Sequence, residues 1–243
     1  MTNRMIATMC LACAAIVLVM GIRMGYNSSS AFNFFYTGSK VMIFVMLAVA
    51  VFGVFKQIVD KRKGVDTSMK VFSGAYIAVS ALLFAFLFYE MSFTDYLEAT
   101  KLLYFVIAAA AALYLIYLIY RHEFFFIALA GVVEILYIWR FARYNQGTTA
   151  FLICQIVLLA LLALAIAFFL KMNATGGTMR IGKNRYRFFP EDGAFVPTIA
   201  GLVILALIAA ALFFVPGVYM MFCAYAAAAV IFGYAVYFTV LML

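Results

Sequence analysis

The feature that most constrains this chain is a series of long apolar segments, separated by short polar ones, that continues to the last residue. A helix needs about 20 apolar residues to cross the hydrocarbon core of a bilayer, and several of these segments approach or reach that length. Charged residues make up only 11% of the chain, whereas soluble domains carry about 25%. We therefore predict an all-α, polytopic transmembrane helix bundle that forms a single integral membrane domain over residues 1–243.

The apolar segments predict eight spans, with a polar, aromatic loop at Tyr26–Ser39 between the first two. The spans cover approximately residues 5–24, 41–55, 71–89, 102–120, 124–141, 149–170, 195–215 and 218–243. The first span has an alternative, because a secretory signal peptide also joins a basic start to an apolar stretch. Its apolar run is longer than a signal core of about 7–15 residues, which favours an uncleaved span.

The basic residues predict the orientation of the bundle. With eight spans and the N-terminus inside, twelve Lys and Arg side chains lie inside and five outside. This distribution obeys the positive-inside rule and predicts an N-in, C-in protein. It also accounts for the net charge of +8 without a nucleic-acid partner. We therefore expect a multi-pass protein of the plasma membrane, surrounded by the lipid bilayer.

Glu134 is an acidic residue in the middle of the span over residues 124–141. A charge at the bilayer centre costs about 2.5–3.5 kcal/mol on insertion scales. Glu134 is therefore expected to face the bundle interior, to be protonated or to have a partner. At about 1.5 Å per residue, Glu134 lies roughly 19 Å from the inner face, and Gln155 on the next, antiparallel span lies roughly 20 Å from it. The matching depths predict that Glu134 and Gln155 form an intramembrane polar site.

Two roles remain open for this pair. An interhelical hydrogen bond would be structural and worth about 0.6 kcal/mol, whereas an intramembrane carboxyl group is also a candidate proton or cation site. His122, the only histidine, is a candidate relay, but Glu134 lies about three turns away. A solvated turn residue is therefore the competing assignment for His122. Tyr137 and Trp139 are expected in an interfacial aromatic belt.

The segment 171–193 is predicted as an inner, basic loop. Apolar and basic residues alternate around Gly182 to Asn184, which is typical of a short β-hairpin. Its basic residues are expected to lie on anionic headgroups of the inner face, at about 1 kcal/mol each, or to dock a protein partner; they are Arg180, Lys183, Arg185 and Arg187. A loop that only sets the orientation of the protein is the competing interpretation.

Small residues four positions apart predict close helix packing, as at Gly74 and Ala78. Other patterns exclude classes of site. One histidine excludes multi-histidine metal and bis-histidine haem centres, and one mid-membrane acid excludes an aspartyl dyad. No metal, cofactor or catalytic residue is predicted. The sequence favours a non-catalytic membrane component, a partner-binding subunit or sensor, that uses its basic inner loops. The alternative is a small-solute or ion-coupled transporter in which Glu134 titrates.

Overall fold

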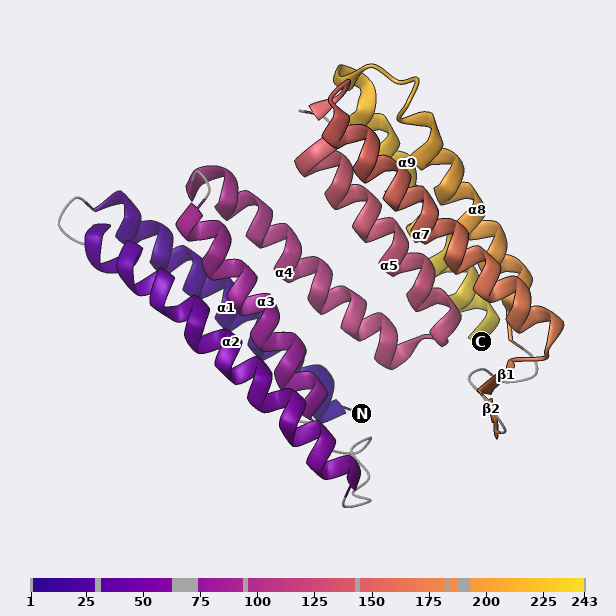
Figure 1. Ribbon diagram of the computed structural model, residues 1–243, viewed down its shortest axis with the longest axis horizontal. Coiled ribbons are helices and arrows are strands. Elements are labelled where there is room, and N and C mark those ends of the chain that lie inside the picture. Colours follow the sequence, from indigo (N-terminus) through magenta and orange to yellow (C-terminus); the bar gives the residue numbers. More distant parts are fainter. Residues whose placement is uncertain are drawn as a thin grey trace. The chain divides into compact units, whose positions relative to one another are not determined.

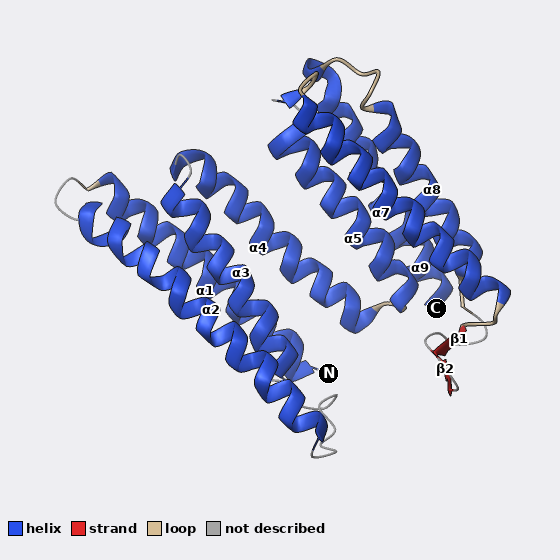
Figure 2. Ribbon diagram, in the orientation of Figure 1, coloured by secondary structure: helices blue, strands red, loops and turns tan. Residues whose placement is uncertain are grey.

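The computed structural model describes residues 2–28, 32–62, 74–93, 96–142, 145–181, 184–187 and 193–242, and these residues are almost entirely helical (Figure 2). The chain divides into two compact units, Met1–Ala112 and Leu113–Leu243. Helix α4 (Tyr96–Ile119) passes from the first unit into the second. Among the described residues, seven helices are long and apolar enough to cross a membrane. This is the build of a multi-pass integral membrane protein.

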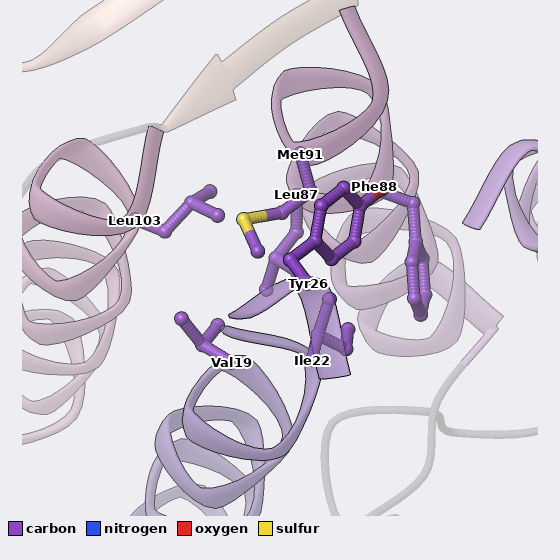
Figure 3. Close-up of a cluster of buried hydrophobic side chains, with 7 residues drawn as sticks. All are labelled: Val19, Ile22, Tyr26, Leu87, Phe88, Met91 and Leu103. Carbon is purple, nitrogen blue, oxygen red and sulfur yellow. The ribbon is translucent and has the colours of Figure 1, made fainter. Parts of the chain in front are cut away.

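The first unit consists of three long helices and the start of α4 (Figure 1). The long helices are α1 (Thr2–Asn27), α2 (Phe32–Arg62) and α3 (Gly74–Phe93). Its core is a cluster of buried side chains from α1, α3 and α4 (Figure 3), namely Val19, Ile22, Tyr26, Leu87, Phe88, Met91 and Leu103. The cluster joins the end of α1 and the end of α3 to the start of α4, so α4 runs antiparallel to α3.

Helices α2 and α3 pack at backbone contact where two glycines meet. A Cβ atom at Gly74 would lie 2.5 Å from the Gly53 carbonyl oxygen and from the Gln57 nitrogen, and one at Gly53 would lie 2.7 Å from the Ala78 nitrogen. Glycine is therefore required at both positions, because helix backbones cannot yield as side chains do. The Gln57 side chain also accepts a hydrogen bond of 3.1 Å from the Ala75 N–H, a free donor at the start of α3. The predicted packing role of Gly74 and Ala78 is confirmed.

The second unit is a four-helix bundle in which consecutive helices alternate in direction. Its elements are α5 (His122–Tyr137), the π-helical turn η1 (Ile138–Ala142), α7 (Thr149–Ala174), α8 (Phe195–Ala211), the 3₁₀ turn η2 (Gly217–Tyr219) and α9 (Met220–Met242). At one end Phe124 of α5 packs on Phe238 of α9. At the other end η1 packs with Phe151, Leu212 and Met220. The start of α5, the end of α7, the start of α8 and the end of α9 therefore lie together.

The predicted hairpin is confirmed. Strands β1 (Thr178–Ile181) and β2 (Asn184–Arg187) pair antiparallel, with Arg180 opposite Arg185. The hairpin begins soon after α7 ends, because Gly176 and Gly177 turn the chain with positive φ angles of 59° and 77° that L side chains rarely adopt. Gly182 and Lys183, which connect the strands, lie outside the described residues.

The helices extend further than hydropathy predicts, and the predicted loop at Tyr26–Ser39 is wrong. Helix α1 continues to Asn27 and α2 already begins at Phe32. With 31 residues, α2 is roughly 46 Å long and exceeds a hydrocarbon core of about 30 Å. Hydropathy identifies the part of a helix that lies in lipid, whereas the backbone continues to form helical hydrogen bonds in the polar layers outside it.

Among the described residues, seven helices are long enough to cross a membrane, whereas eight spans are predicted. The remaining predicted span corresponds to the shorter apolar helix α8. It has 17 residues, about 25 Å at 1.5 Å per residue. Its hydrogen bonding continues as a tighter turn, in which the N–H groups of residues 212–215 donate to the carbonyl oxygens of residues 209–211. This continuation reaches the predicted end of the seventh span. Eight spans and the N-in, C-in orientation remain predictions.

Candidate functional site

Glu134 and Gln155 are both fully buried in the second unit. Glu134 shares one face of α5 with Ala130 and Tyr137, because residues four and seven positions apart line the same side of a helix. Gln155 lies in the same way between Phe151 and Leu158 on α7. Ala130 and Tyr137 pack against the cluster of Leu158, Leu162 and Ala209, so the two polar residues belong to faces that meet.

Two contacts join these antiparallel helices. The Tyr137 hydroxyl donates to the Phe151 carbonyl oxygen at 3.4 Å, and the Phe126 ring packs on the Phe169 ring with centroids 5.2 Å apart. On α5, Glu134 lies between Phe126 and Tyr137, and on α7, Gln155 lies between Phe151 and Phe169, so the two contacts bracket both polar residues. The match in level of Glu134 and Gln155 stays a prediction.

The predicted hydrogen bond between the two side chains is absent. The Gln155 Nε2 instead donates to the Ala209 carbonyl oxygen of α8. Both Glu134 carboxyl oxygens and the Gln155 Oε1 are buried without a hydrogen-bond partner among the described residues. Depth calculated from the sequence gives the level of a residue but not its rotation about the helix. It also does not reveal that a third helix, α8, offers the amide a backbone acceptor.

Residues of α5 and α9 complete the surroundings of Glu134. Cys223 of α9 lies within electrostatic range of the Glu134 carboxyl group. Tyr137 is half-buried and directs its hydroxyl across the bundle to α7; its place in an interfacial belt stays a prediction. The π-helical turn η1 begins one turn after Glu134. Short π-helical segments inside α-helices are frequent at functional sites. No pattern in the sequence predicted this one.

This site is a buried cluster that is rich in hydrogen-bond acceptors. We refer to Glu134 and Gln155 as the polar cluster. An apolar groove of about 470 Å³ between α8 and α9, lined by residues such as Pro197, Ile204 and Tyr234, does not include Glu134 or Gln155. Among the described residues, no group of three or more His, Cys, Asp and Glu side chains could hold a metal ion.

His122 lies far from the polar cluster. It is the first residue of α5, is exposed, and stacks on Tyr117 with ring centroids 5.3 Å apart. Twelve residues of helix separate it from Glu134, roughly 18 Å, so the structure does not bring the two together. The next residue, Glu123, is buried. As an acidic residue in the first turn of α5, it has a favourable interaction with the helix dipole.

The register of the hairpin determines which of its basic residues lie on the same face. Side chains alternate between the two faces of a strand pair, and residues directly opposite share a face. The pairs Arg180–Arg185 and Thr178–Arg187 therefore occupy one face of the ladder, and Met179–Tyr186 and Ile181–Asn184 occupy the other. Three arginines thus share one face, which we call the arginine face. Lys183, predicted as a fourth basic residue, lies outside the described residues.

Comparisons with protein-family models, curated proteins and solved structures return no match for this chain. Its class follows from its own build, which is that of a helical bundle with apolar, membrane-length helices.

Proposed function

We propose that this chain is a non-catalytic component of the plasma membrane that binds an acidic segment of a protein partner through the arginine face of its hairpin. The observation that carries the proposal is the register of β1 and β2, which places Arg180, Arg185 and Arg187 on one face. We place this face on the inner side of the membrane, because the segment carries much of the basic charge that the positive-inside rule assigns there.

The arginine face needs a counter-charge. Arg180 and Arg185 are directly opposite each other, and like charges in this position destabilise a strand pair. A two-stranded hairpin by itself is at best marginally stable in water. Carboxylates of a partner would remove the repulsion, since arginine binds them with two parallel hydrogen bonds. The hairpin is therefore best suited to a partner that supplies acidic side chains.

The opposite face of the hairpin favours a protein over the lipid surface as this partner. Met179, Ile181 and Tyr186 occupy that face with Asn184. An amphipathic element at a membrane buries its apolar face in the interface and turns its basic face outward. We place this apolar face on the membrane, which leaves the arginine face to an aqueous partner. Anionic headgroups are the competing ligand.

The alternative function, a small-solute or ion-coupled transporter, needs a polar path to Glu134. Glu134 is fully buried, and the groove between α8 and α9 is apolar and does not include it. Transporter sites commonly lie where helices are broken near the midplane, whereas the π-helical turn η1 follows Glu134 without interrupting the helix. These features support a component in preference to a transporter.

Site-specific photo-crosslinking in native membranes tests the proposal. A benzophenone side chain at Thr178, on the arginine face, is expected to give protein adducts of one defined mass. The same side chain at Met179, on the apolar face, should give none. The double variant Arg180→Glu/Arg185→Glu should lose the adduct, and Arg180→Lys/Arg185→Lys should retain most of it. Adducts with lipid alone from both faces would assign the hairpin to headgroups and refute a protein partner.

A further inference from the structure

We propose that the polar cluster of Glu134 and Gln155 binds one monovalent cation, either a proton or an alkali-metal ion, that neutralises the Glu134 carboxylate. This binding site is independent of the partner-binding function proposed for the hairpin. Its starting point is an imbalance between acceptors and donors. Three oxygens of the cluster accept no hydrogen bond from any described residue, and buried polar groups are generally paired.

In the part of the chain that the structure describes, positive charges lie only at the ends of the helices that surround the cluster. Helices α8 and α9 contain no Lys, Arg or His, and the single basic residue of α7, Lys171, lies in its last turn. The basic residues at the two ends of α5 are Arg121, which directly precedes it, His122, at its first position, and the exposed Arg140 of η1. The titratable groups near Glu134 are Tyr137 and Cys223, and both are neutral when protonated. Nothing described in this bundle balances a carboxylate at Glu134.

The ligand class follows from charge and donor type. Carboxylate and amide oxygens are hard ligands that suit hard cations. One carboxylate balances one positive charge, so a divalent ion would leave an uncompensated charge inside an apolar bundle, which is strongly unfavourable. A proton would convert Glu134 into an O–H donor directed at the Gln155 Oε1. An alkali-metal ion would instead be held between the carboxylate and amide oxygens.

The hydrogen bond from Gln155 to Ala209 gives Gln155 a positioning role. Because Nε2 donates to the carbonyl oxygen of α8, the amide is anchored with its Oε1 as the free acceptor. The Gln155 amide therefore has only an acceptor left for a ligand of the polar cluster. A rotated amide would present a donor instead and would bind the bare carboxylate, which makes the orientation a determinant of cation binding.

Thermal unfolding of the purified full chain in micelles tests the proposal. The fluorescence of Trp139, the only tryptophan and part of η1, provides the signal. A ligand that binds only the native state raises Tm, and above its Kd each tenfold increase adds roughly 3–6 °C for a chain of this size. Sodium, lithium and potassium chlorides are compared with choline chloride at equal ionic strength. A separate series at fixed salt runs from mildly acidic to mildly alkaline pH.

The salt series and the pH series together identify the cation. Stabilisation by an alkali chloride over choline indicates a metal ion, whereas a fall in Tm with rising pH in choline indicates a proton. In either case Glu134→Gln should abolish the response, and Gln155→Leu should move its midpoint to an at least tenfold higher cation concentration. Glu123→Gln, which alters another buried carboxyl of α5, should leave the response unchanged.

The proposal is overturned by a wild-type Tm that responds to neither series. It is also overturned by a response that survives in Glu134→Gln. Should Glu134→Gln not fold, the comparison of Gln155→Leu with Glu123→Gln decides, because equal midpoints in these two variants contradict a site at the polar cluster.

Discussion

The substitution Gly74→Ala tests the packing of α2 on α3 with a single added methyl group. The new Cβ would lie 2.5 Å from the Gly53 oxygen and the Gln57 nitrogen, both backbone atoms. Relieving this overlap requires the helices to separate by about 1 Å, and a gap of that size forfeits a quarter to a half of the dispersion energy of the contacts it opens. Overpacking of this kind costs about 1–3 kcal/mol.

The same movement lengthens the 3.1 Å hydrogen bond between the Gln57 side chain and the Ala75 N–H. Its loss adds about 1 kcal/mol, so Gly74→Ala should destabilise the protein by roughly 2–4 kcal/mol. For a chain of this length the corresponding fall in Tm is roughly 4–16 °C. The fall is measured by thermal unfolding in micelles followed by circular dichroism.

Gly38→Ala is the matched control. Gly38 also lies in α2, and a Cβ there would meet no atom within 4 Å. Alanine is the better helix former by up to about 1 kcal/mol, so this variant should be as stable as the wild type or more so. The opposite signs of the two substitutions are the critical result. A Tm for Gly74→Ala equal to that of Gly38→Ala would refute backbone contact between α2 and α3.

Two further predictions concern the second unit. Thr148 caps α7 by accepting a hydrogen bond of 3.1 Å from the Phe151 N–H. Thr148→Ala should therefore cost about 1 kcal/mol of stability and lower the Tm by a few degrees in the same assay. Thr148→Ser keeps the acceptor oxygen and should have the Tm of the wild type. The second prediction concerns the sides of the membrane, because the end of α7 and the end of α9 lie at the same end of the bundle. A cysteine at Thr178 and a cysteine added after Leu243 should both react with a membrane-impermeant maleimide only when the inner face is exposed. Labelling of the two cysteines from opposite sides would contradict α8 as a span.

The sequence predicts the helices of this chain well because lipid imposes a simple rule on them. Backbone groups in hydrocarbon must be paired within the helix, so an apolar segment such as residues 149–170 has one available structure, and α7 contains it. The rule does not operate outside the lipid. This is why hydropathy misses the first turns of α2, from Phe32 onward, and predicts a loop in their place.

The hairpin was predictable for a different reason. Alternation with a period of two around a glycine specifies both the strand type and the position of the turn, and β1 and β2 pair as that pattern requires. The pattern also contains the arginine face, since Arg180, Arg185 and Arg187 fall on one side once the turn is placed.

The sequence predicted only part of the candidate site. Counting residues along two antiparallel helices predicts a common level for Glu134 and Gln155, because the rise per residue is constant, and both residues are buried in the same bundle. It does not give the rotation of each helix or the neighbour at that level, and so it misses the Ala209 carbonyl group that receives the Gln155 amide. The π-helical turn and the approach of Cys223 depend on the packing of α9, which no local pattern encodes.

Proton and alkali-ion flux in proteoliposomes is the measurement that tests the central claim most directly, because it separates a sealed membrane component from a transporter. The purified wild-type chain is reconstituted with an internal pH-sensitive or ion-sensitive dye and exposed to an imposed gradient. A fully buried Glu134 predicts a flux no greater than that of empty vesicles, with no difference between wild type and Glu134→Gln. A flux that the wild type supports and Glu134→Gln abolishes, with both proteins folded, would contradict the account and establish transport.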